Sequence, residues 1–292
     1  MNFTSWLKDD SKIILFDGGM GTELIKRGLD PGKVLDLHNI ENPNTVREIL
    51  ASYYQAGSDM VQSCTFSSNL VNLEKHGVAD RLMETNSKAL ENLKAVCPKD
   101  KLIVGDIGPS GEFRPPVGQA TGEEWENGFR TQIEVLEPGV DLWHVETMSD
   151  IQEILAAVKA VKSVSKKPII ASMTYRKSKR GYFTIMGDSL ENCVEILENN
   201  QVDVIGANCT LTSDQMIELA GKLVELTSLP VSIKPNAGQP RLEGGKTTYA
   251  QKPEDYAEDI KKMIEMGVKI VGGCCGTSPA HIKLLREYID AL

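Results

Sequence analysis

No stretch of this sequence stays apolar for the ~18 residues that a membrane-crossing helix requires. The first ten residues lack the basic and apolar regions of a secretory signal peptide. The net charge of −9 provides no excess of positive charge, and nucleic acid binding depends on a basic surface. We therefore expect no membrane and no nucleic acid among the partners. A cytoplasmic enzyme is the class that these absences favour.

No linker-like or low-complexity segment divides the chain, so we expect one domain over residues 1–292. Apolar runs rich in β-branched residues alternate with amphipathic runs from end to end. The runs predict strands over 13–16, 60–62, 102–106, 142–146, 169–173, 202–205, 231–234 and 268–271. Helices are predicted over 45–55, 85–96, 121–136, 150–163, 189–198, 213–226, 253–266 and 279–288.

Eight strand–helix repeats in a chain of this length predict an α/β fold, the (β/α)8 or TIM barrel. A doubly wound open sheet is the competing architecture, but the glycine-rich dinucleotide fingerprint that usually follows its first strand is absent here. In a barrel, functional side chains gather where strands end, at the carboxyl-terminal face. The polar and unusual residues of this sequence lie at those places.

The sequence also has no CxxC pair of the kind that structural zinc sites use, although it contains six cysteines. Instead Cys274 and Cys275 are adjacent, with Gly272 and Gly273 before them and Gly276 after. A disulfide between neighbours is strained, and the glycines allow a sharp turn that brings both sulfurs to one point. Cys209 follows another strand and is the third candidate ligand. We interpret the three as a zinc site with an open fourth position; unliganded thiols are the alternative.

Three thiolates make Zn²⁺ an electron-rich centre, poorly suited to hydrolysis, for which nitrogen and oxygen ligands are usual. Such a centre suits a substrate thiol, which loses its proton on coordination and stays nucleophilic. The four histidines do not fall at the strand ends that carry the cysteines, which disfavours a hydrolytic metalloenzyme. The chemistry indicated is attack by a thiolate on an electrophilic carbon.

Two acids, Asp17 and Glu146, end strands among glycines and apolar residues. Each is a candidate for binding a substrate ammonium group, or for capping loop amides as a structural carboxylate. The loop 18–22 offers backbone N–H groups suited to a carboxylate, and its glycines also fit a tight turn. Asn236 either orients a ligand or closes its own turn.

Three further features have simpler interpretations. His144 shares a strand face with Glu146 and is expected to be packed and hydrogen-bonded. The basic segment 176–180 is expected to be a solvated loop. Cys64 lies near the proposed active face, but a free cysteine is commonly a small buried apolar residue.

With these residues in place, the sequence resembles the zinc-dependent homocysteine S-methyltransferase family. The resemblance is carried in order by segments along nearly the whole chain, namely 17–22, 65–66, 146–147, 206–209, 235–238 and 272–277. Segments 106–111 and 234–238 are most similar to the homocysteine-binding domain of cobalamin-dependent methionine synthase. The resemblance implies a TIM barrel with zinc on Cys209, Cys274 and Cys275.

It further implies homocysteine as the acceptor, with its amino group near Asp17 and Glu146 and its carboxylate near the amides of Gly19 and Met20. The implied donor is a small methylsulfonium or a methylcorrinoid (cobalamin). Since the sequence ends at Leu292 without further modules, such a corrinoid is expected on a separate protein. The alternatives are a component of a corrinoid-dependent methyl transfer or demethylation system with another substrate, and a non-catalytic zinc- or thiol-binding subunit.

Overall fold

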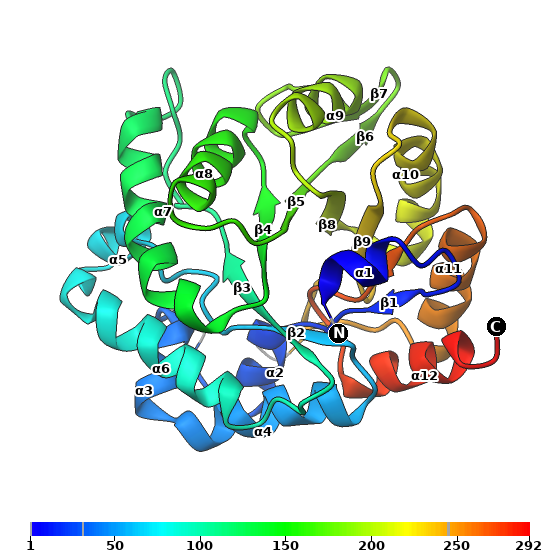
Figure 1. The fold of residues 1–292 in the computed structure, drawn as a ribbon, viewed down its shortest axis with the longest axis horizontal. Coiled ribbons are helices and arrows are strands. Elements are labelled where there is room, and N and C mark those ends of the chain that lie inside the picture. The colour runs from blue at the N-terminus through cyan, green and yellow to red at the C-terminus, as the bar shows by residue number, and fades with distance from the viewer. Residues whose placement is uncertain (1, 31, 244–245) are drawn as a thin grey trace.

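Eight parallel strands form the centre of the molecule (Figure 1). The structure is a computed structural model that describes residues 2–30, 32–243 and 246–292. The strands are β1 (Ile14–Leu15), β2 (Met60–Gln62), β3 (Leu102–Ile107), β4 (Leu142–Met148), β5 (Ile169–Met173), β8 (Val204–Thr212), β9 (Val231–Asn236) and β12 (Ile270–Val271). They run in the order β1-β12-β9-β8-β5-β4-β3-β2, which confirms the predicted TIM barrel.

The seam of the barrel lies between β1 and β2. Asp59, just before β2, donates its backbone N–H to the carbonyl of Leu15 over 2.7 Å, and its carboxylate accepts the N–H of Leu15 over 2.9 Å. One side chain thus replaces a ladder bond at the place where the eight strands meet. The barrel is nearly closed as a result.

Helices surround the strands on the outside (Figure 1). The long ones are α4 (Pro43–Gln55), α6 (Leu82–Lys94), α7 (Gly122–Leu136), α8 (Ile151–Val164), α9 (Leu190–Asn199), α10 (Ser213–Leu226), α11 (Pro253–Glu265) and α12 (Pro279–Ile289). Their starts follow capping chemistry: Thr121 and Glu124 form a capping box, and Asp150 and Ser189 accept amide hydrogen bonds. All eight were predicted to within three residues at either end.

Apolar side chains fill the inside of the barrel, and α1 (Phe3–Leu7) packs on them at the end where the strands begin. Phe3 and Trp6 of this helix join a lumen cluster that includes Phe16, Val104 and Ile170. In Figure 1, α1 lies across the near end of the barrel. With that end covered, the carboxyl-terminal ends of the strands remain for a site.

Several elements were not predicted. Two antiparallel hairpins rise after β5 and β9, namely β6 (Arg176–Ser178) with β7 (Gly181–Phe183), and β10 (Arg241–Glu243) with β11 (Lys246–Thr248). The segment 176–180 is therefore an exposed strand and its turn, and the expectation of a loop was wrong. Short helices were also missed, because they bury too few residues to show a period: α2 (Met20–Lys26), α3 (His38–Glu41) and α5 (Leu70–Lys75), with 3-10 turns at Leu35–Leu37, Ala79–Arg81 and Glu137–Gly139.

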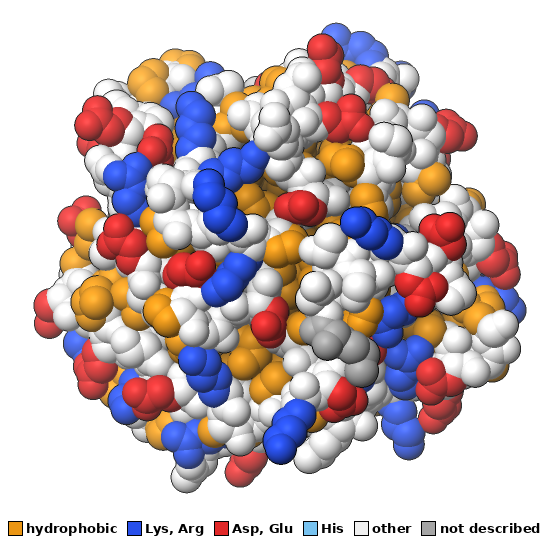
Figure 2. All heavy atoms as spheres, viewed as in Figure 1, with side chains coloured by type: hydrophobic (Ala, Val, Ile, Leu, Met, Phe, Trp, Pro, Cys, Tyr) orange, Lys and Arg blue, Asp and Glu red, His pale blue; other side chains and the backbone are white. Residues whose placement is uncertain are grey.

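Two observations concern the outer surface. Among the described residues, no helix is long and apolar enough to cross a membrane. On the face shown in Figure 2, acidic and basic side chains are interspersed, so this face presents no field of a single sign.

Candidate active site

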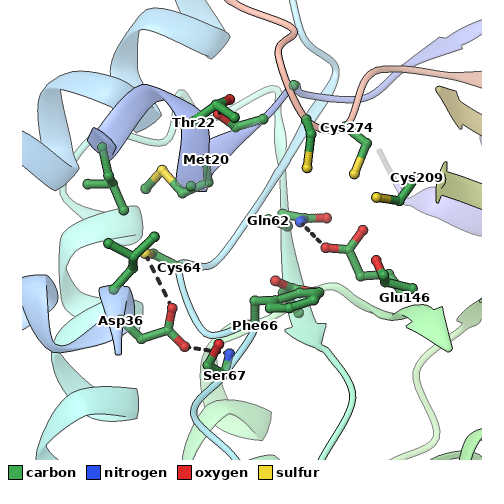
Figure 3. A pocket seen from close by; sticks show the side chains of 18 of the residues that line it. Met20, Thr22, Asp36, Gln62, Cys64, Phe66, Ser67, Glu146, Cys209 and Cys274 are labelled. Carbon is green, nitrogen blue, oxygen red and sulfur yellow. Dashed lines mark hydrogen bonds between the residues drawn. The ribbon is translucent and has the colours of Figure 1, made fainter. Parts of the chain in front are cut away.

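Three cysteine sulfurs meet at the carboxyl-terminal end of the barrel. Cys274 and Cys275 follow β12, Cys209 belongs to β8, and all three sulfurs lie within 4.8 Å of one another. Figure 3 shows the side chains of Cys209 and Cys274 directed into the same space, beside Glu146. The structure therefore brings together the three predicted ligands.

The glycines around the cysteine pair are required by the tightness of the turn. A Cβ on Gly273 would lie 2.3 Å from Oγ1 of Thr277, which is far inside van der Waals contact. Gly276 has a φ of +83°, in the left-handed region that side chains rarely adopt. The turn thus forms only with glycine at these places.

Cys209 reaches the cluster through an irregular strand. The pairing of β8 with β9 shifts register between Asn208 and Thr212, and Cys209 and Thr210 have φ values of 58° and 63°. A bulge of this kind redirects a side chain, at the expense of a strained backbone. The predicted strand ended at residue 205, whereas β8 continues to Thr212 with the cysteine inside it.

The donor set fits a thiophilic cation such as zinc. Hydrogen bonds that Cys274 and Cys275 can donate to Cys209 lower the pKa of Cys209 to about 3 and raise the pKa values of the two donors, so the cluster favours one thiolate, on Cys209. Asn236 accepts the backbone N–H of Cys275 over 3.1 Å and holds the turn. Cys64, Cys97 and Cys193 lie outside this cluster. Zinc itself stays a prediction.

Glu146 is buried beside the sulfurs and is held at both oxygens. Gln62 donates from Nε2 to Oε1, and Asn208 donates from Nδ2 to Oε2, each over 2.9 Å. Asn208 also lies 3.8 Å from the sulfur of Cys274, so it links the carboxylate to the cysteines. Thr147, at φ 60°, marks a register shift in β4 at this point.

Lys234 forms a buried ion pair with Asp17. Its Nζ lies 2.8 Å from Oδ1 of Asp17 and 3.0 Å from Oε1 of Gln62, above the ring of Phe16. Burial alone lowers the pKa of Lys234, but the carboxylates of Asp17 and Glu146 outweigh it and raise this pKa above its usual value. Lys234 is therefore a buried ammonium that donates its hydrogen bonds to Asp17 and Gln62 in the interior of the barrel.

His144 is packed and hydrogen-bonded, as predicted. Nδ1 lies 3.0 Å from Oε1 of Gln62, and Nε2 lies 3.0 Å from Oγ of Ser172. Burial lowers the pKa of His144 well below its usual value, so the ring is neutral. It supports Gln62 from the interior of the barrel.

A cavity of about 350 Å³ opens beside the sulfur cluster. Gly19, Met20, Glu146, Cys209, Cys274 and Cys275 belong to its wall, and among the described lining residues neither Asp17 nor Asn236 is present. The N–H of Gly19 already donates to Thr277. At the opposite end of the pocket in Figure 3 lie Asp36, Cys64 and Ser67.

Sequence reasoning missed five side chains of the site. Gln62, Asp106 and Lys234 end predicted strands and Asn208 follows one, whereas Tyr249 lies near Cys275. The strand-end rule that identified Glu146 applies equally to the first four. A lysine inside an apolar strand run was a signal as well. For Tyr249 the sequence carries no such signal, since it follows a hairpin whose position the sequence does not predict.

Fold and site together define a class: (β/α)8 barrels that place a cluster of thiols and a buried carboxylate around one cavity at the strand ends. The chain belongs to the homocysteine S-methyltransferase family, whose sequence profile matches residues 14–289.

Two relatives are methionine synthases. That of Mycobacterium tuberculosis (strain ATCC 25618 / H37Rv) is 29% identical over 93% of this chain and 24% of its own length. That of Mycobacterium leprae (strain TN) is 28% identical with the same coverage. The chain thus spans about a quarter of these relatives.

Solved structures give a fuller match in length. The metallated form of the homocysteine methyltransferase MmuM from Escherichia coli superposes with a TM-score of 0.79 at 25% identity, covering 94% of this chain and 96% of MmuM. The carboxyl transferase domain of Rhizobium etli pyruvate carboxylase has a TM-score of 0.55 at 16% identity, over 99% of this chain and 48% of that one, and shares the fold alone.

Proposed function

We propose that this protein transfers a methyl group to the thiol of homocysteine and so forms methionine, with zinc held by Cys209, Cys274 and Cys275. The convergence of these three sulfurs on one cavity wall, in a member of this family, carries the proposal. When bound, zinc supplies a Lewis acid that lowers the pKa of a thiol joining it, while the thiolate ligands keep that sulfur nucleophilic.

The residues of the chain supply binding and orientation. Glu146, fixed at both oxygens, accepts a hydrogen bond from the substrate ammonium. The start of α2 at Met20 has no side-chain cap, which leaves backbone N–H groups for the substrate carboxylate, next to the Gly19 amide that Thr277 occupies. Asp17 and Asn236 lie outside the described lining of the cavity. Asp17 pairs with Lys234, and Asn236 holds the turn that carries the two cysteines.

The donor is a methylsulfonium or a methylcorrinoid. The substrate sulfur forms a bond to the methyl carbon as the bond from that carbon to the donor breaks, and the electron pair leaves with the donor. The thiol proton goes to solvent. Such leaving groups depart without protonation, so the site needs no general acid.

The test is methionine formation from homocysteine by the zinc-loaded protein, with S-methylmethionine, S-adenosylmethionine, methylcobalamin and methyltetrahydrofolate in parallel. We expect turnover with a sulfonium or with methylcobalamin, and loss of both zinc and turnover in Cys275→Ser. Cys97→Ser, a cysteine outside the cluster, is the matched control and keeps its zinc. Absence of methionine with every donor, from protein with one zinc bound, contradicts the proposal.

A further inference from the structure

Tyr249 follows the hairpin of β10 and β11 and lies against the turn that carries the two adjacent cysteines. A Cβ on Gly276 would lie 2.4 Å from both Cβ and Cγ of Tyr249, so this side chain covers the turn directly. Two backbone hydrogen bonds hold the segments together: Ala237 donates to the carbonyl of Cys275 over 2.9 Å, and Gln251 donates to the carbonyl of Ala237 over 3.2 Å. Tyr249 is thereby kept beside Cys275.

The hydroxyl of Tyr249 is within hydrogen-bonding reach of the sulfur of Cys275. A phenol can donate here, and a thiolate can only accept. The sulfur of Cys274 has a comparable partner in Asn208, whose Nδ2 lies 3.8 Å from it. Hydrogen bonds between the cysteines themselves end when a metal ion replaces their protons, whereas the hydroxyl of Tyr249 keeps its own proton.

The acceptor thiolate is not the only nucleophile at this end of the cavity. The sulfurs of Cys209, Cys274 and Cys275 belong to half-buried residues of the same wall, so a methyl donor that enters meets them as well. Attack by Cys275 would join its sulfur to the methyl carbon as the bond from that carbon to the donor breaks, and the electron pair would leave with the donor. The thioether so formed has no charge with which to hold a metal. The protein therefore has to keep its own sulfurs less reactive than the acceptor sulfur.

We propose that Tyr249 donates a hydrogen bond to the thiolate of Cys275 and makes this sulfur a poorer nucleophile, so that the methyl group goes to the acceptor thiol. The inference rests on the proposed function and adds to it a positioning residue that acts through Cys275. A hydrogen bond occupies a lone pair of the thiolate, and a less basic sulfur is a weaker nucleophile. The acceptor sulfur enters from the cavity, where Tyr249 is not among the described lining residues, so it lacks this donor.

Two other roles for Tyr249 compete with this one. In the first, its phenol oxygen takes the open position of the metal. That position faces the cavity that the acceptor enters, and the place of Tyr249 outside the described lining disfavours this role. In the second, the ring only covers Gly276. Tyr249→Phe keeps the ring and removes the hydroxyl, so this variant separates a packing role from a hydrogen bond.

The test follows methylation of each cysteine by iodomethane in the zinc-loaded protein without homocysteine, using fragment mass spectrometry of its peptides. In Tyr249→Phe we expect Cys275 to react about three- to tenfold faster than in the wild type, because roughly half the free energy of a hydrogen bond to a charged sulfur is lost on attack. Cys209 and Cys274 should keep their rates and serve as internal references. Tyr288→Phe removes the hydroxyl of a half-buried tyrosine near the end of α12 and is the matched control, which should change no rate.

Cobalt in place of zinc gives a second measurement, which access of the reagent does not affect. A sulfur without its hydrogen bond gives electron density to the metal more readily, so the sulfur-to-cobalt charge-transfer bands of Tyr249→Phe should move to lower energy.

Five outcomes overturn the inference: an unchanged rate at Cys275, an equal rise at all three cysteines, an equal rise in Tyr288→Phe, unshifted charge-transfer bands, or loss of the metal from Tyr249→Phe, which a ligand role predicts. Neither measurement depends on methionine formation, so a failure of the proposed reaction is recognised separately. A wild type that binds neither zinc nor cobalt contradicts the proposed function and the inference with it.

Discussion

Lys234 and Asp17 form an ion pair in the interior of the barrel, with 2.8 Å between Nζ and Oδ1 and both side chains no more than 3% exposed. The residues are 217 positions apart in the chain. Lys234 comes from β9 and Asp17 follows β1, two strands that β12 separates in the sheet. Because Asp17 is paired with Lys234, its carboxylate is not available to a ligand in the cavity. Gln62 links the pair to Glu146, since it accepts from Lys234 and donates to Glu146.

Breaking this pair on one side should destabilise the fold strongly. Lys234→Met leaves the carboxylate of Asp17 buried without its cation, and we expect the free energy of unfolding to fall by about 3–5 kcal/mol. Urea denaturation of the metal-free protein measures it. The double variant Asp17→Asn with Lys234→Met should recover at least half of the loss, because it leaves no unpaired charge. Additive effects of the two substitutions show that the pair does not act as a unit.

Asn208 should affect substrate binding without being a metal ligand. Asn208→Ala removes the donor to Oε2 of Glu146 and the acceptor for the N–H of Thr147. We expect homocysteine affinity to fall about tenfold, with one zinc still bound per chain. Asn192→Ala, on the exposed side of α9, is the control and should change neither quantity. Loss of the zinc instead means that Asn208 supports the sulfur cluster rather than the carboxylate.

The strained backbone beside Cys209 predicts an unusual response to glycine. Thr210 has a φ of 63°, a conformation that a β-branched residue adopts at a cost of roughly 1–2 kcal/mol. Thr210→Gly should therefore leave the unfolding free energy unchanged or raise it by up to about 1 kcal/mol. Thr131→Gly, in the helix α7, should lower it by roughly 0.3 kcal/mol, the difference between the helix propensities of the two residues. Equal losses in thermal or urea unfolding of the two variants argue against strain at Thr210.

Glu153 gives the stability a pH dependence of predictable sign. Burial raises the pKa of Glu153 from 4.5 to about 7, although Ser110 donates a hydrogen bond from its backbone N–H over 2.7 Å. A carboxyl whose pKa is higher in the folded state makes ionisation unfavourable there. Its contribution is greatest below pH 4.5 and is lost as the pH rises through about 7.

Glu153→Gln keeps an oxygen that accepts from Ser110 and removes the titration. The unfolding free energy of the variant, relative to the wild type, should therefore increase by up to about 3 kcal/mol between pH 4.5 and 8. Chemical denaturation at several pH values measures this difference. A constant difference across the range shows that the pKa of Glu153 is the same in the folded protein as in the unfolded chain.

Much of the molecule follows from local patterns in the sequence. The repeat of apolar and amphipathic runs predicts the barrel, because strand and helix periods are local properties. The glycine-flanked pair Cys274–Cys275 predicts a turn that joins two sulfurs, and the strand-end rule adds Cys209 and Glu146. The lengths of β4 and β8 could not be predicted, because both strands continue past the bulges at Thr147 and Cys209. Those bulges depend on neighbouring strands.

Only the tertiary structure decides which charges remain for a ligand. From the sequence, Asp17 and Glu146 are equivalent acids at strand ends. In the folded chain Lys234 forms an ion pair with Asp17, while Gln62 and Asn208 donate hydrogen bonds to Glu146. Oδ1 of Asp106 has no hydrogen-bond partner within the described part of the chain. Hydrogen bonds and ion pairs between strands far apart in the chain depend on distances of a few tenths of an ångström. No pattern within a single strand contains that information.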